Sequence, residues 1–242
     1  MSPRRECRVR AARGSATAWW VGLQLVALAA SAQLTAFTDP VAFHAAIPGG
    51  AQIQTVDFED IAAGTRIANG DSRDGITFHH SIAGGAIDLA VEDGLPTTSG
   101  VRFLGLDAAP VADRQIQHGD ELDMVLPASH AFGMTVVTGD PLLADDILLV
   151  TPQGTAGNSP APLATTSDGG FVYFIGLVAA QPFDTVQVRY GDPAHTVAFL
   201  YTVDDLILGK AAIAEIPALG HLGLALLALG LVVTALIFLD RR

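Results

Sequence analysis

Residues 185–190 read TVQVRY and residues 121–126 read ELDMVL. Polar and apolar side chains alternate in both stretches, the pattern of a β-strand with one buried face. Other short apolar runs, bounded by turn-forming residues, predict further strands at 52–58, 76–80, 86–91, 101–104, 130–137, 147–151, 170–177 and 196–208. Many short strands without long helical patterns between them predict an all-β fold, an antiparallel β-sandwich that is jelly-roll-like.

A short helix is predicted before the first of these strands. Residues 38–47 read TDPVAFHAAI, with a capping residue, a proline in the first turn and apolar side chains spaced for one face. The run stops at Pro48 and two glycines. We therefore predict a domain over residues 33–208 that begins with this helix, followed by a linker at 209–215.

The N-terminus has the composition of a secretion signal. Five arginines lie within the first thirteen residues, an apolar run covers 16–29, and Ala30 and Ala32 flank Ser31 ahead of Gln33. This order of basic, apolar and small residues predicts a signal peptide at 1–32, read by the translocon and cut by signal peptidase after Ala32. An uncleaved anchor is the competing interpretation, although the apolar run is short for a membrane span.

The C-terminal segment has the composition of a membrane helix. Residues 222–239 contain no charged side chain and are followed by Asp240, Arg241 and Arg242. Eighteen helical residues cover about 27 Å, close to the thickness of the hydrocarbon core. The terminal arginines favour the cytoplasmic side, which places the body outside the membrane. A buried globular helix is the alternative.

The same region resembles a family of sorting signals. Ile216, Pro217, Ala218 and Leu219 precede the apolar run and the terminal arginine pair. This order resembles the PEP-CTERM and IPTL-CTERM tails, and the resemblance covers residues 216–242. It implies recognition by an exosortase-type membrane protease. The tail departs from both forms, because the PEP form has Glu at Ala218 and Pro at Leu219, and the IPTL form has Thr at Ala218.

Charge and cysteine content restrict the chemistry of the body. Beyond residue 13 the chain keeps 8 of its 13 basic residues and 24 of its 25 acidic ones, a balance of −16. Such an acidic chain disfavours nucleic acid as a partner and is compatible with divalent cations or a polysaccharide. The single cysteine, Cys7, lies in the predicted signal peptide. A mature chain without a thiol excludes cysteine catalysis and thiolate metal sites.

Two segments of the body resemble known exported domains. Residues 56–65 with 74–78 resemble the opening of exported β-sandwich proteins with this kind of tail, and residues 199–208 are similar to the last strand of carbohydrate-binding jelly rolls. In jelly rolls of that kind an early acid and an acid on the last strand meet around a structural calcium ion. The resemblance therefore implies Glu59 with Asp204 or Asp205 as calcium ligands, and solvated charges or turn caps are the alternative.

Other patterns of catalytic or ligand-binding residues are weaker. His79 and His80 point to opposite faces of an ideal strand, so they are unsuited to share one metal. Seven aromatic residues could either form a platform that stacks against sugar rings or pack in the core: Phe171, Tyr173, Phe174, Phe183, Tyr190, Phe199 and Tyr201.

We predict a non-enzymatic, exported cell-envelope or extracellular-matrix protein, anchored by 222–239 or released from it. A carbohydrate-binding module and a secreted hydrolase are the alternatives.

Overall fold

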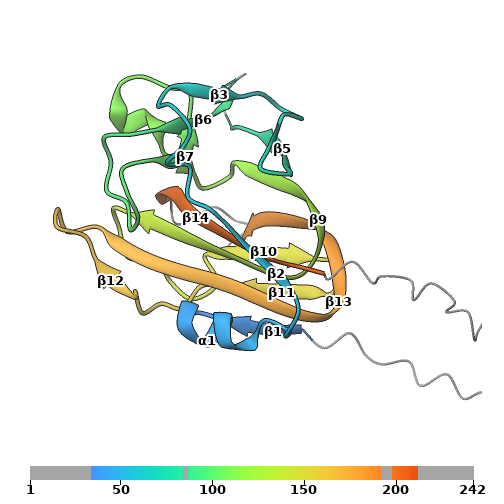
Figure 1. The fold of residues 1–242 in the computed structure, drawn as a ribbon. Helices are drawn as coiled ribbons and strands as arrows, with labels where there is room; N and C mark the ends of the chain where they lie inside the picture. Colours follow the sequence, from blue (N-terminus) through green and yellow to red (C-terminus); the bar gives the residue numbers. More distant parts are fainter. Residues whose placement is uncertain (1–33, 84, 86, 192–197, 212–242) are drawn as a thin grey trace, which may run out of the picture. The chain divides into compact units, whose positions relative to one another are not determined.

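The computed structural model describes residues 34–83, 85, 87–191 and 198–211, all within one compact unit that begins at Ala32 (Figure 1). The described chain is an antiparallel all-β fold with one short α-helix, consistent with the predicted sandwich. The predicted signal peptide, sorting motif and membrane helix lie outside the described residues. Within them, no helix is long and apolar enough to cross a membrane.

Strands make up nearly all of the regular structure. In chain order, the elements are β1 (Leu34–Phe37), α1 (Pro40–Ala46), β2 (Gln52–Val56), β3 (Thr65–Ile67), β4 (Ser72–Arg73), β5 (Ile76–Ser81), β6 (Leu89–Glu92), β7 (Phe103–Leu106), the 3₁₀ turn η1 (Val111–Arg114), β8 (Ile116–Gln117), β9 (Glu121–Thr138), β10 (Ile147–Thr151), β11 (Gly154–Gly157), β12 (Ala164–Thr165), β13 (Phe171–Tyr190) and β14 (Leu200–Lys210).

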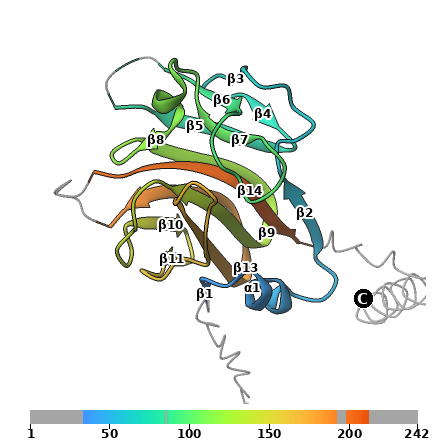
Figure 2. The same cartoon turned by 90° about the vertical axis from the view of Figure 1, so that its left-hand side faces the viewer.

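Two long strands organise the fold. β9 and β13 were each predicted as two separate strands, but each runs on without interruption and curves strongly (Figures 1 and 2). Pro127, which lies between the two segments predicted for β9, is inside the continuous strand. The β9–β13 pairing changes register near Phe183, where an irregularity lets the strands bend.

The bend divides the sheet into two halves. Half-sheet A contains β5, β9 over 121–126, β13 over 183–190, β10 and β11. Half-sheet B contains β13 over 171–178, β9 over 129–138 and β14. In half-sheet B, β1 and β12 extend the sheet beyond β13, and β2, β7 and β8 pair with β14.

One apolar core joins the two half-sheets. Alternate side chains of each half point inward and are fully buried or nearly so, as the period of two in a strand requires. They include Phe78, Met124 and Phe183 from half-sheet A, and Phe132, Tyr173 and Tyr201 from half-sheet B. A shared core of this kind makes the halves two layers of one folded body.

Helix α1 covers part of the outer face of half-sheet B. It begins as predicted, because the Asp39 carboxylate accepts the backbone N–H of Val41 at 2.8 Å and Pro40 lies in the first turn. Phe43 is fully buried against Phe174 and two strand glycines. A methyl group on Gly176 would lie 2.7 Å from the Phe43 ring, so the helix can approach only a glycine there.

The described chain enters and leaves half-sheet B at the same end. Leu34 of β1 pairs with Ala179, and Gly209 of β14 pairs with Ala131, which itself pairs with Val178. This is also the end at which β13 bends, on the right of Figure 1. β14 continues to Lys210, beyond the predicted domain limit at Leu208.

Candidate functional site

The candidate site is a groove at the other end of half-sheet B, on the outer face that α1 covers only in part. It consists of two adjoining pockets of about 270 and 760 Å³. Leu95, Pro96 and Asp168 line both pockets. Val137 of β9 and Thr202 of β14 line the first pocket, and Val172 of β13 lines the second.

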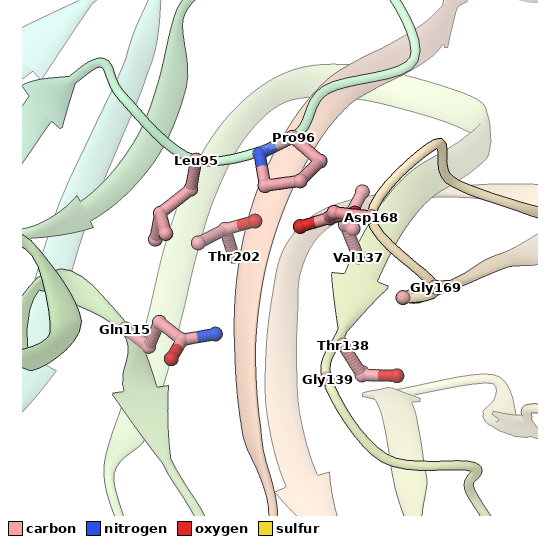
Figure 3. Close-up of a pocket in the computed structure, with 10 residues that line it drawn as sticks. Leu95, Pro96, Gln115, Val137, Thr138, Gly139, Asp168, Gly169 and Thr202 are labelled. Carbon is pink, nitrogen blue, oxygen red and sulfur yellow. The ribbon is translucent and has the colours of Figure 1, made fainter.

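Two chain segments form the walls of the groove. One wall is residues 94–101, which connect β6 to β7. The other is the turn 164–170, which leads from β12 into β13 and is closed by a hydrogen bond from the Thr166 N–H to the Gly170 carbonyl at 2.8 Å. Figure 3 shows side chains from both walls and from the strands around the first pocket.

The three predicted calcium ligands all contact the first wall. Oδ2 of Asp204 accepts the backbone N–H and the hydroxyl of Thr98 and the Ser99 N–H, the last at 3.0 Å. Asp205 accepts the Ser99 hydroxyl at 2.8 Å. Where this segment leads into β7, Oε1 of Glu59 accepts the N–H groups of Val101 and Arg102 at 2.7 and 2.6 Å.

A bulge in β14 explains how two consecutive acids reach the same wall. Val203 pairs with Val136 and Leu206 with Met134, so three steps along β14 match two along β9. The extra residue falls at Asp204 and Asp205 and breaks the alternation that would send their side chains to opposite faces. Nothing in the local pattern of residues 199–208 indicates this irregularity.

Burial dominates the electrostatics of this cluster. Asp204 is completely buried, and loss of solvation raises its pKa although the hydrogen bonds from Thr98 and Ser99 oppose the change. Burial also raises the pKa of Asp205, and the neighbouring Asp204 charge adds to the rise. Both carboxyls therefore hold protons more strongly than exposed aspartates do.

The structure brings Glu59, Asp204 and Asp205 to one loop, where they accept hydrogen bonds from different residues. Across the described residues, no group of three or more His, Cys, Asp or Glu side chains has the proximity needed to hold a metal ion. The contacts that the structure shows for these carboxylates are to backbone and hydroxyl donors of the wall. The calcium site stays a prediction from sequence resemblance.

The interior of the groove carries polar groups from different parts of the chain. Figure 3 shows the Asp168 carboxylate and the Thr202 hydroxyl pointing toward one another, with the Gln115 side chain directed into the same space. Within the described chain, the side chains of Gln115 and Thr202 make no hydrogen bond. Asp168 accepts the Thr166 hydroxyl, and this hydrogen bond lowers the pKa of Asp168.

An aromatic cluster closes the core at this same end. The hydroxyls of Tyr190 and Tyr201 lie 3.1 Å apart, and Phe199 packs against both rings. Tyr190 is the last residue of β13 in half-sheet A, whereas Tyr201 is the second residue of β14 in half-sheet B. Burial raises the pKa of both phenols, so both stay neutral donors. The cluster thus ties the two layers together where the strands do not bend.

The aromatic side chains are used mainly for packing. Of the seven that were considered as a sugar platform, five are buried: Tyr173, Phe174, Phe183, Phe199 and Tyr201. The described residues that line the groove include no aromatic side chain. His79 and His80 do point to opposite sides of β5, since His80 is buried and faces Asp88 at 3.2 Å whereas His79 is exposed.

Sequence reasoning did not find the groove. Gln115, Asp168 and Thr202 are far apart along the chain, and none belongs to a recognisable motif. The Asp168-Gly169-Gly170 turn signal was visible in the sequence, but its position above β9 depends on long-range pairing. Comparison of the chain with protein-family models and with curated proteins found no match.

Proposed function

We propose that the chain is a non-enzymatic, exported cell-envelope or extracellular-matrix protein that displays its groove away from the membrane. A jelly-roll-like sandwich stands outside the cytoplasm, delivered by the translocon and signal peptidase through residues 1–32. The apolar segment 222–239 holds it at the membrane until an exosortase-type protease acts near Ile216.

One observation supports the display role above the others. The described chain begins at Leu34 and β14 ends at Lys210 on the same end of half-sheet B, and the groove lies at the opposite end. Along β9, the seven steps from Ala131 to Thr138 span about 23 Å. A body tethered by either terminal segment therefore holds its bend near the membrane and its groove away from it.

The use of the buried carboxylates supports a binding role over catalysis. Asp120 accepts the N–H groups of Ala83 and Gln117 at 2.7 and 2.8 Å, and Asp204 accepts those of Thr98 and Ser99. Catalytic carboxylates in hydrolases are aimed at a substrate. These carboxylates instead hold loops in place, which suits a rigid display domain.

Processing and location are tested by intact mass and amino-terminal sequence of the protein recovered from membrane and from medium. We expect a membrane form that starts at Gln33 and a released form that also lacks residues 222–242. Deleting 222–242 should send all of the protein to the medium. A chain that still starts at Met1 and stays in the cytoplasm would contradict export.

The direction of display is tested separately with single cysteines. Cys7 is the only cysteine in the chain, so Ser167→Cys at the groove and Gln181→Cys at the bend each give one label site once Cys7 is changed to Ser. Both positions are exposed. In vesicles, a fluorophore at 181 should be quenched by lipid-borne quenchers more strongly than one at 167. Equal or reversed quenching would refute the display orientation.

A further inference from the structure

We propose that the groove binds an uncharged, polyhydroxylated chain, in chemical terms a segment of a neutral glycan. The recognising groups are the Asp168 carboxylate, the Gln115 amide and the Thr202 hydroxyl, above an apolar floor. This site goes beyond the display role and does not depend on it, because every group involved lies in the folded body.

The chemistry of the lining selects for hydroxyl groups. A carboxylate accepts hydrogen bonds, an amide both donates and accepts, and a hydroxyl does either, so the three together match the donors and acceptors of sugar hydroxyls. Leu95, Pro96 and Val137 supply apolar surface for the C–H faces of a sugar ring. Among the described lining residues the only charged side chain is Asp168, which disfavours an anionic ligand.

The dimensions favour a chain over a single ring. The two pockets adjoin at Leu95, Pro96 and Asp168, and each volume is close to or within the usual range for small-ligand sites of about 300–1,000 Å³. A ligand that fills both must pass the point at which Asp168 lies. Asp168 is therefore positioned to contact the middle of a bound oligosaccharide.

The groove is organised before any ligand arrives. Asp204 and Glu59 hold the wall 94–101 at Ser99 and Val101, and the Thr166 hydroxyl holds the Asp168 carboxylate within the turn. Fixed donors and acceptors reduce the entropy lost on binding. This arrangement suits a ligand with weak individual contacts, as neutral sugars have.

The test is calorimetric titration of the full chain, purified in a zwitterionic detergent without a sugar headgroup. The probes are cellohexaose, maltohexaose and chitin hexaose as neutral chains, with hexagalacturonate as the anionic comparison. We expect at least one neutral hexasaccharide to bind and hexagalacturonate not to bind. Asp168→Asn should weaken that binding about tenfold, since it removes a charge-assisted hydrogen bond.

The controls separate binding from folding and from export. Asp184→Asn makes the same change on an exposed carboxylate of half-sheet A and should leave binding unaltered. Gln115→Ala is a second groove variant, and thermal unfolding of each variant verifies its fold.

No binding of any neutral probe at millimolar concentration would overturn the site. Binding of hexagalacturonate alone, or neutral binding that neither groove variant weakens, would overturn it equally. Failure of export in the cell would leave these outcomes unchanged.

Discussion

The two ends of half-sheet B are covered in opposite ways. At the bend, α1 lies on the sheet through the apolar side chain of Phe43, which fits over Gly133 and Gly176. At the groove, the wall 94–101 is held by hydrogen bonds to the carboxylates of Glu59, Asp204 and Asp205. Apolar packing leaves no room for a ligand, whereas a polar wall stands off the sheet and leaves a groove. The two ends thus differ in the chemistry that covers them, and the groove lies at the end with the polar wall.

The strongest test of this comparison is Phe43→Ala. The fully buried ring is removed from a site whose glycines cannot fill the space, so we expect the free energy of unfolding to fall by about 3–5 kcal/mol. Denaturant unfolding of the variant measures the loss. Val41→Ala in the same helix is the control, because Val41 is 76% exposed and should change stability by less than about 0.5 kcal/mol.

Removing the carboxylate of Asp204, which holds the wall 94–101 from β14, should have the next largest effect. Asp204→Ala leaves the N–H groups of Thr98 and Ser99 without their acceptor, at a cost of about 2–3 kcal/mol. Hydrogen exchange should show faster opening of those two amides and little change at Gly133. Asp205→Ala, which loses contacts to hydroxyls only, should cost less. Equal protection of Thr98 in the variant and the parent would show that the wall does not depend on Asp204.

A smaller effect is expected in the pH dependence of stability. Burial raises the pKa of Asp120 above its ordinary value near 3.8, so the folded state binds this proton more tightly than the unfolded state. Its contribution is fully present below that value and is lost as pH rises through the folded pKa. As pH rises above about 4, the free energy of unfolding of Asp120→Asn should therefore decline less steeply than that of the parent protein.

Chemical unfolding at several pH values measures this slope, and the slope is the readout because the substitution also alters two hydrogen bonds. Asp184→Asn, an exposed carboxyl, serves as the control and should keep the slope of the parent. An Asp120→Asn slope equal to that of the parent would show that Asp120 does not contribute.

The smallest effect is expected at the helix cap. Asp39→Ala removes the carboxylate that accepts the Val41 N–H, and should cost about 1 kcal/mol of unfolding free energy. Asp39→Asn retains a capping oxygen and should recover most of that loss. A cost near that of Phe43→Ala would mean that the cap, and not the buried ring, determines how α1 is held.

The sequence was informative where structure is local. The helix at 38–47 was predicted from its cap and proline, and the strand at Ile147–Thr151 has the bounds that its apolar run indicated. The alternating stretch 121–126 does place Leu122 and Met124 in the core. These features depend on neighbours within a few residues, which a single sequence records directly.

Features that depend on long-range pairing were missed. Residues 121–126 and 130–137 were predicted as separate strands, yet β9 runs through both because each half pairs with other strands. β1, β11 and β12 are short segments whose extended form comes from their partners in the sheet. The groove needs Gln115, Asp168 and Thr202 in one place, and nothing local in the sequence relates them.

The pairing of the first strands with later ones bears on the proposed export. β1 pairs with β13 at Ala179, and β2 pairs with β14 up to Lys210, so β2 finds its partner only when the last strand is present. A chain that crosses the membrane amino-terminus first therefore cannot complete its sheet until residue 210 has emerged. High contact order makes this step slow and exposes strand edges meanwhile. An apolar stop at 222–239 would hold the emerging chain at the membrane while its last strand inserts between β9 and β2.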